Sequence, residues 1–255
     1  MPKILFWDIE TSLQPVAVFQ LAKNDWIDPS NLLGERYIIC AAWKWQDDPD
    51  VHTVSVLDDP KRYKRNPHDD AHVVTTLRTV LSQADILVHH NGDKFDKRYL
   101  DTRILAHGLD PLPPLATIDT YKVAKQKFLF NSNKLDYIGQ FLKLGQKLPT
   151  TPGLWMRILR GDATAIPEMV AYNAQDVRLL EDVYHALQGH IPKHPHTTVY
   201  DGTSGCPRCG SSKLQSRGVH RARTSTYQRY QCQSCGGWTR SRLSVSAPAL
   251  THLAC

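Results

Sequence analysis

The feature that most constrains the fold is an apolar segment at the N-terminus that runs directly into two acidic residues. Residues 3–8 are predicted to form a strand, because every residue between Lys3 and Asp8 is apolar. Such a continuous apolar run is typical of a strand in a sheet covered on both faces. Because side chains alternate along a strand, Asp8 and Glu10 share a face at its C-terminal end. Two such carboxylates repel each other unless a positive charge lies between them. The pattern therefore predicts a divalent cation, with a solvated strand end as the alternative.

The rest of the first 188 residues favours an α/β fold. Further strands are expected over residues 36–45, 51–57 and 85–89, and a loop over residues 59–68. The spacing of apolar residues predicts helices over 72–81, 91–107, 120–128, 134–143 and 167–187, with a short one around Trp155. Strands in the first half and helices in the second predict a mixed sheet flanked by helices.

Two more acidic groups follow predicted structural elements. Asp93 and Asp96 stand where a buried strand gives way to a helix, and Phe95 can anchor that turn in the core. The alternative is an acid that merely favours a helix N-terminus. Tyr172 and Asp176 are four residues apart in the longest predicted helix, so they lie on one helix face, where a local hydrogen bond is the alternative.

In combination these segments form an ordered triplet, Asp8-x-Glu10-Thr11, Asn91-x-x-x-Phe95-Asp96 and Tyr172-x-x-x-Asp176. The triplet resembles the DEDD superfamily of 3′–5′ exonucleases, and the tyrosine marks the DEDDy branch, which includes the proofreading domains of family-B DNA polymerases. The resemblance covers residues 3–188. It implies a ribonuclease-H-like mixed sheet flanked by helices.

The resemblance also implies roles for individual residues. Two catalytic Mg²⁺ or Mn²⁺ ions would be held by four acids, Asp8, Glu10, Asp96 and Asp176, with Asp93 left open as a competitor of Asp96. Tyr172 would position the attacking water, since its ordinary pKa near 10 makes it a poor base. Thr11 and Asn91 would lie beside the bound strand. Two divalent ions can activate water and stabilise the leaving oxygen of a phosphodiester, and hard oxygen ligands select magnesium or manganese.

Four of the six cysteines form two tight pairs, Cys206-x-x-Cys209 and Cys232-x-x-Cys235, each followed by glycine. In a chain without a secretory signal, four thiolates at this spacing predict a closed tetrahedral Zn²⁺ site. A hairpin within residues 219–231 would complete a small zinc ribbon, which zinc binding itself would fold. Cys40 lies in an apolar run and is expected in the core.

The net charge of +6 is concentrated near the C-terminus, where residues 201–255 contain eight Lys or Arg and a single acid, Asp201. Basic residues interleaved with Tyr227, Tyr230 and Trp238 suit phosphate contacts and base stacking. The ribbon residues expected to bind substrate are Arg221, Arg223 and Arg229. A ribbon that docks onto a protein is the alternative.

These observations predict an exonuclease domain over residues 1–188, a linker over 189–205, a zinc ribbon over 206–242 and a tail over 243–255. The expected partner is single-stranded DNA or a DNA 3′ end, with a replication or repair protein as a further partner. RNA cleavage and a nucleic-acid or protein adaptor with a vestigial nuclease core remain alternatives. The sequence contains no apolar run long enough for a membrane span and no signal peptide, so a cytoplasmic protein is expected. Phage or bacterial origin is implied only by the resemblance.

Overall fold

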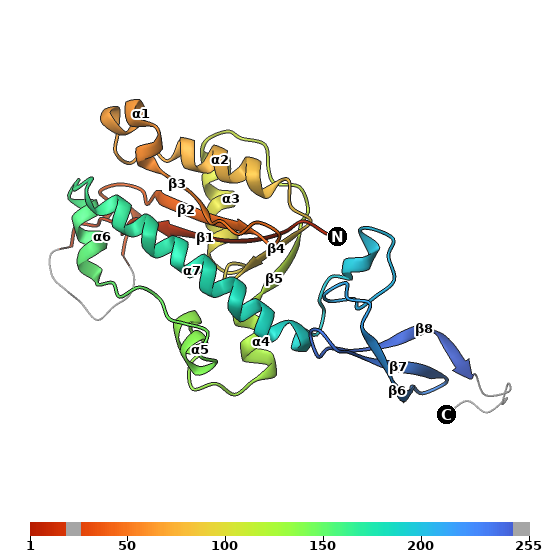
Figure 1. Ribbon diagram of the computed structural model, residues 1–255. Coiled ribbons are helices and arrows are strands. Elements are labelled where there is room, and N and C mark those ends of the chain that lie inside the picture. Colours follow the sequence, from red (N-terminus) through yellow and green to blue (C-terminus); the bar gives the residue numbers. More distant parts are fainter. Residues whose placement is uncertain (19–26, 247–255) are drawn as a thin grey trace.

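A five-stranded mixed sheet forms the centre of the larger part of the molecule (Figure 1). The computed structural model describes residues 1–18 and 27–246. The strands lie in the order β3-β2-β1-β4-β5, with bounds β1 Ile4–Thr11, β2 Ile38–Trp45, β3 His52–Ser55, β4 Ile86–His89 and β5 Ala116–Asp119. β1 is antiparallel to β2 and parallel to β4. β3 pairs antiparallel with β2, and β5 pairs parallel with β4. The predicted mixed sheet flanked by helices is confirmed.

Helices cover both faces of this sheet. They are α1 Pro60–Arg65, α2 Ala71–Leu81, α3 Asp96–Ala106, α4 Thr120–Lys127, α5 Leu135–Phe141, α6 Pro152–Leu159 and α7 Ala165–Leu187. The long helix α7 crosses in front of the strands in Figure 1 and contacts β1, β2 and β3. α4, α5 and α6 also contact α7, whereas α2 packs on β2, β3 and α3. Short 3₁₀ turns occupy Pro29–Asn31, Val56–Asp58, Gln188–His190 and Thr197–Val199.

The central strand β1 divides its side chains between two apolar clusters. Leu5, Trp7 and Ile9 join a cluster that includes α2, α3 and α6. Ile4 and Phe6 join the cluster that includes α4, α5 and the C-terminal half of α7. Because the alternation continues along the strand, Asp8 and Glu10 project to the same side as Ile4 and Phe6. The continuous apolar run is thus explained by a strand buried on both faces.

Three local predictions are wrong. Residues 60–65, expected in a loop, form α1, because Pro60 suits the first helical turn and the Asp59 side chain accepts a hydrogen bond from the Arg62 amide at 3.0 Å. α3 begins at Asp96 rather than at Asn91, because Asn91 has a left-handed φ of 67°. Strand β5 was not expected, because only two of its four residues are buried, so it lacks the continuous apolar run that marks β4.

Beyond α7, three antiparallel strands form a separate small sheet in the order β6-β7-β8. Their bounds are β6 Leu214–Arg221, β7 Thr226–Cys232 and β8 Trp238–Ser246. The hairpin expected between the cysteine pairs is β6–β7. β8 pairs with β7 as far as Ser246 opposite Thr226, so residues 243–246 belong to a strand rather than to the expected tail. Residues 247–255 of that tail lie outside the described part of the chain.

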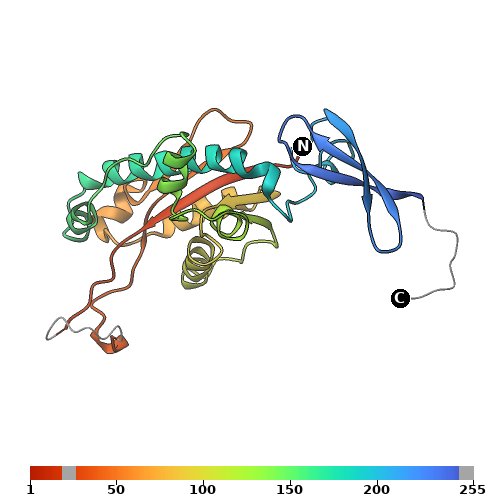
Figure 2. The same ribbon diagram turned by 90° about the horizontal axis from the view of Figure 1, so that it is seen from below.

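The segment between the two sheets is packed against the ribbon (Figure 2). The Gln188 side chain donates to the Arg208 carbonyl at 3.2 Å, and the Arg208 guanidinium donates to the carbonyls of Ile191 and Trp238 at 3.2 and 2.9 Å. Gly189 approaches Cys235 so closely that a Cβ there would lie 2.2 Å from the Cys235 carbonyl oxygen. Gly189 and Ile191, from the segment expected to form a linker, therefore take part in docking the ribbon onto the end of α7. Within the described residues, no helix combines the length and apolarity that a membrane crossing requires.

Candidate metal centre and nucleic-acid interface

Three carboxylates from the first strand and the longest helix converge on one point. Asp8 and Glu10 come from β1, and Asp176 comes from α7, where it is 2% exposed. One ligand oxygen of each lies within 4.8 Å of the others. Two elements that are distant in sequence but adjacent in the core thus bring these acids together.

Asp96 approaches the same point from the N-terminus of α3. It is 4% exposed, and the Ile9 backbone amide is among the groups that stabilise its carboxylate, which places it against β1 between Asp8 and Glu10. Asp93 lies elsewhere. Its carboxylate pairs with His89 Nε2 at 3.0 Å and with Lys122 Nζ at 2.7 Å, and the His89 hydrogen bond holds its pKa well below the usual range. Of the two candidate acids, Asp96 is therefore the one that joins the cluster.

The clustered carboxylates are strongly perturbed. Burial, followed by the charges of Asp96, Glu10 and Asp176, raises the pKa of Asp8 well above its usual value. Burial and then the charge of Asp176 raise the pKa of Glu10 to about 8, and burial raises that of Asp96 to about 6. Such a group of buried like charges is stable in ionised form only when a cation neutralises it.

The sequence did not point to Lys147, which lies in the segment between α5 and α6. Its Nζ donates to Asp176 Oδ2 and, at 3.1 Å, to the Tyr172 hydroxyl. Burial disfavours the lysine charge, but the ion pair with Asp176 outweighs this effect and raises the Lys147 pKa. Burial and the Asp176 charge also raise the pKa of Tyr172. A lone lysine in a polar segment carries no sequence signal for such a position.

A second residue not anticipated from the sequence, Asn173, fixes the orientation of Asp8. Its side-chain amide donates to Asp8 Oδ2 at 2.7 Å, and its carbonyl oxygen lies 3.9 Å from the Cys40 thiol. Asn173 is fully buried, as is Cys40, which confirms the core placement expected for that cysteine. Because Asn173 follows Tyr172 in the helix, the Tyr-x-x-x-Asp motif brings a third functional side chain with it.

The acid cluster fits a hard divalent cation. Asp176 Oδ1 is buried and has no hydrogen-bond partner among the described residues, although its other oxygen is bound by Lys147. An ionised oxygen left without a partner in the interior is costly. The cluster supplies only carboxylate oxygens, and these are the ligands that magnesium and manganese prefer.

Two hollows open beside the acids. Thr11 lines one of about 400 Å³ together with Arg36, Thr151 and Trp155. Asn91 lines another of about 390 Å³, whose walls include His90, Tyr121, Lys147 and Tyr172. The two residues expected beside a bound strand therefore line different hollows.

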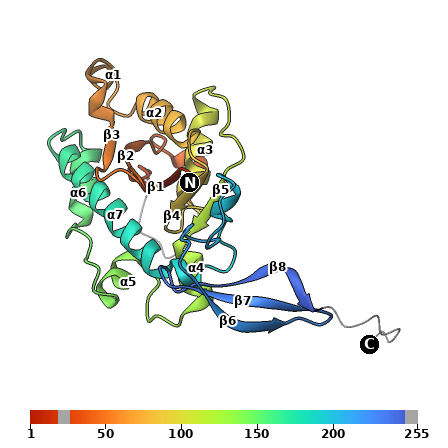
Figure 3. The same cartoon turned by 45° about the vertical axis from the view of Figure 1, so that its right-hand side comes forward.

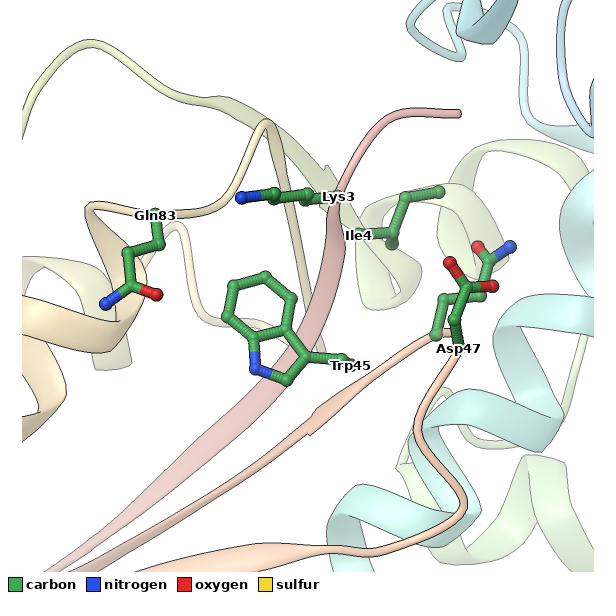
Figure 4. A pocket seen from close by; sticks show the side chains of 6 residues that line it. Lys3, Ile4, Trp45, Asp47 and Gln83 are labelled. Atoms are coloured by element: carbon green, nitrogen blue, oxygen red, sulfur yellow. The ribbon is translucent and has the colours of Figure 1, made fainter.

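A further hollow of about 230 Å³ lies at the opposite end of β1 from the acids (Figure 4). Lys3, Trp45 and Gln83 line it, with Ile4 and Asp47 on its other side. Asp8 and Glu10 lie farther along the same strand and do not reach it. The hollow is therefore separate from the carboxylate cluster.

The four paired cysteines converge at the base of the ribbon. All four sulfur atoms lie within 4.8 Å of one another, and the Cys206–Cys235 and Cys209–Cys232 pairs are both 3.6 Å apart. Tetrahedral zinc with bonds of about 2.3 Å requires sulfur atoms roughly 3.8 Å apart. Gly210 and Gly236, which follow the two knuckles, have φ of 72° and 71° and so permit the tight turns. The thiols are arranged as a structural zinc site requires.

The arginines expected to bind substrate lie on or beside strands β6 and β7. Figure 3 shows these strands extending away from the five-stranded sheet. Arg229, on β7, places its guanidinium 4.8 Å from the centroid of the Trp238 ring. Arg221 is the last residue of β6, and Arg223 lies in the turn that follows. All three are exposed.

Comparison with known proteins identifies the larger part of the molecule. The family model of the RNase_H superfamily matches residues 46–188, a range that includes Asp96, Tyr172 and Asp176 but not β1. The family B DNA polymerase from the hyperthermophilic archaeon Pyrobaculum calidifontis has a similar fold, with a TM-score of 0.53 and 15% sequence identity over 88% of this chain. This chain covers 31% of the length of that polymerase. No curated protein sequence matches this chain.

Proposed function

This chain belongs to the RNase_H superfamily, and on that basis we propose that it is a metal-dependent 3′–5′ exonuclease that acts on DNA. The observation that carries the proposal is the convergence of Asp8, Glu10 and Asp176 within 4.8 Å, with Asp96 beside them and one buried Asp176 oxygen without a partner. The fold shared with a family B DNA polymerase supports nucleic acid as the substrate.

The acids would hold two divalent ions. Asp8, Glu10 and Asp176 would bind one, and Asp96, which lies against β1 beside Asp8, would help to hold the second. When bound, the ions activate the attacking water and stabilise the charge of the leaving oxygen. Asn173 keeps one Asp8 oxygen fixed by its 2.7 Å hydrogen bond, so the other oxygen would remain available to the ions.

Tyr172 would position the water rather than remove its proton. Its pKa is raised above the ordinary value by burial and by Asp176, so the hydroxyl stays protonated at neutral pH and donates a hydrogen bond. Lys147 holds that hydroxyl at 3.1 Å and brings a positive charge to the edge of the Asn91 hollow. The lysine would thereby also stabilise the negative phosphate.

The first test uses single-stranded DNA labelled at its 5′ end, with Mg²⁺ or Mn²⁺, and a matched RNA of the same sequence. Shortening from the 3′ end is expected for DNA and is expected to disappear in Asp8→Ala, while binding of the strand persists. Digestion of RNA alone would replace the DNA proposal with an RNA exonuclease. An intact substrate in all lanes, with binding retained, would favour an adaptor with a vestigial core.

The paired variants Asp96→Asn and Asp93→Asn test the identity of the fourth acid. Asp96→Asn should lower kcat by at least about 100-fold, since a metal ligand is lost, whereas Asp93→Asn should retain cleavage because that carboxylate is bound to His89 and Lys122. The reverse result would show that Asp93 is the ligand.

A further inference from the structure

One face of the ribbon gathers aromatic and basic side chains from all three strands, and all of them are exposed except the half-buried Tyr227. Its members, named here the arginine–aromatic face, are His220, Tyr227, Arg229, Trp238 and Arg240. Arg229 lies over the Trp238 ring at 4.8 Å, and Arg240 lies over the Tyr227 ring at 3.8 Å. His220, Arg229, Trp238 and Arg240 also line a shallow hollow of about 200 Å³.

The strand register explains why these residues share a face. His220 pairs with Tyr227 across β6 and β7, and Arg229 pairs with Arg240 across β7 and β8. Residues directly opposite each other in a sheet point the same way, and Trp238 is two residues from Arg240. By the same alternation, Arg221 and Tyr230 point to the other side.

The charge of this face is not neutralised by the protein. Residues 202–255 contain neither Asp nor Glu, and within the described part of the chain Arg229 and Arg240 form no ion pair. Each guanidinium is instead held by an aromatic ring, and Arg229 also donates to the Arg217 carbonyl at 3.0 Å. Cation–π contacts fix the position of a cation without cancelling its charge. The arginines are therefore held ready for anionic groups that come from outside.

The exposed ring of Trp238 favours single-stranded nucleic acid among the possible polyanions. Trp238 is 47% exposed although it is the largest apolar side chain of the ribbon. Bases of a single strand can stack on tryptophan, tyrosine or a guanidinium plane, whereas paired bases in a duplex cannot reach a flat sheet. A protein partner would have to supply several acids and an apolar patch together.

We propose that the arginine–aromatic face binds single-stranded nucleic acid, with Arg229 and Arg240 on the phosphates and with Trp238 and Tyr227 stacked against bases. The inference deepens the proposed function, since the strand held there is the one whose end would reach the acids. Of the side chains that the sequence suggested for phosphate contacts and base stacking, it retains Arg229, Tyr227 and Trp238. It leaves out Arg223 of the turn, and Arg221 and Tyr230, which point to the other side of the sheet.

The ribbon is docked rather than freely tethered, so the two binding regions have a fixed separation. Gln188, at the end of α7, donates to the Arg208 carbonyl, and Arg208 and Cys209 line a small pocket together with Ile4 of β1. Asp8 lies four residues farther along that strand, about 13 Å away. Substrates too short to span both regions can occupy only one of them at a time and should therefore gain no avidity from the other.

The test measures binding of the full chain, in an Asp8→Ala background so that DNA is not degraded, by fluorescence anisotropy with oligonucleotides of graded length. Trp238→Ala should weaken binding of a strand of about 30 nucleotides by about tenfold. Arg240→Gln should weaken it several-fold and reduce the slope of log affinity against log salt by about 0.7. The loss should be smaller for a strand of about four nucleotides, because such a strand can bind at the acids without touching the ribbon. Zinc content and circular dichroism confirm that each variant ribbon is folded.

Lys213→Gln is the matched control, because it removes one positive charge from the ribbon outside the arginine–aromatic face. The proposal is overturned if Trp238→Ala and Arg240→Gln bind the long strand as tightly as Lys213→Gln does. It is also overturned if duplex DNA binds more tightly than single-stranded DNA, or if the two variants weaken the binding of a protein ligand but not that of DNA. Because binding is measured without cleavage, absence of nuclease activity would refute the proposed function and leave this inference standing.

Discussion

At the scale of single residues, the carboxylate cluster is a place where function opposes stability. Four acids are held together in the interior, and burial raises the pKa of each of them. Lys147 offsets part of the repulsion by pairing with Asp176. The lysine is thus the protein's own counter-charge at a site built for cations.

Replacing Lys147 tests that role. Lys147→Met should lower the free energy of unfolding of the metal-free protein by about 2 kcal/mol, because a charged hydrogen bond is lost and Asp176 stays buried. Mn²⁺ should restore most of this loss by supplying the missing charge. Thermal and urea unfolding with and without Mn²⁺ measure both effects. Lys125→Met, at an exposed position of α4, is the control, and an equal loss there would contradict the interpretation.

The raised pKa of Glu10 predicts how the protein responds to pH. An unfolded glutamate has a pKa near 4.3, and the folded value is about 8. The folded metal-free protein therefore binds an extra proton between these values, and its stability should fall as the pH rises from about 5 to 8. A metal competes with that proton, so Mn²⁺ affinity should rise with pH, by at most about tenfold per unit for one proton.

Calorimetric titration of Mn²⁺ at several pH values, combined with thermal unfolding in its absence, checks both trends. Glu10→Gln removes the titrating group, so the pH dependence of the metal-free stability should become flatter in that variant. Metal affinity that is independent of pH in the unmodified protein would show that the carboxylate is already ionised when the metal arrives.

At the scale of elements, the existence of α7 could be predicted from the sequence, whereas its contacts with β1 could not. Its apolar periodicity predicted the helix, and the four-residue spacing of Tyr172 and Asp176 predicted a shared face. The placement of Asn173 against Asp8 depends instead on how α7 crosses β1, a long-range contact that no local pattern encodes. The role of Lys147 was missed for the same reason, because it depends on the path of an irregular segment between α5 and α6.

The edge strand β5 and the turn before α3 show the same limit on a smaller scale. β5 is half-buried over its first two residues and pairs in parallel with β4. It forms a strand because of that pairing, which its own sequence does not indicate. Asn91 takes a left-handed conformation, and its backbone amide donates to Asp119 Oδ1 at 2.8 Å. That contact delays the start of α3 until Asp96, which then occupies the first helical turn and faces β1.

At the scale of the whole molecule, the two sheets differ in what holds them together. The larger one has two extensive apolar clusters, whereas only Cys206, Cys232 and Gly237 are buried among residues 206–245. A segment with so little apolar burial cannot offset its conformational entropy, so zinc must supply the stability of the ribbon. The cysteine spacing predicted this dependence, but the docking of Gln188 and Arg208 was not visible in the sequence.

Removal of zinc should therefore unfold the ribbon and leave the larger sheet intact. With excess Mg²⁺ present, a zinc-selective chelator should change the tryptophan fluorescence, because Trp238 becomes fully exposed, and should abolish the binding of long single strands. The main thermal transition should shift by only a few degrees. Cys209→Ser should reproduce this state, and Cys40→Ala, which changes a buried thiol outside the zinc site, should retain the metal. A single transition that moves by tens of degrees in Cys209→Ser would mean instead that the docked ribbon and the five-stranded sheet unfold as one cooperative unit.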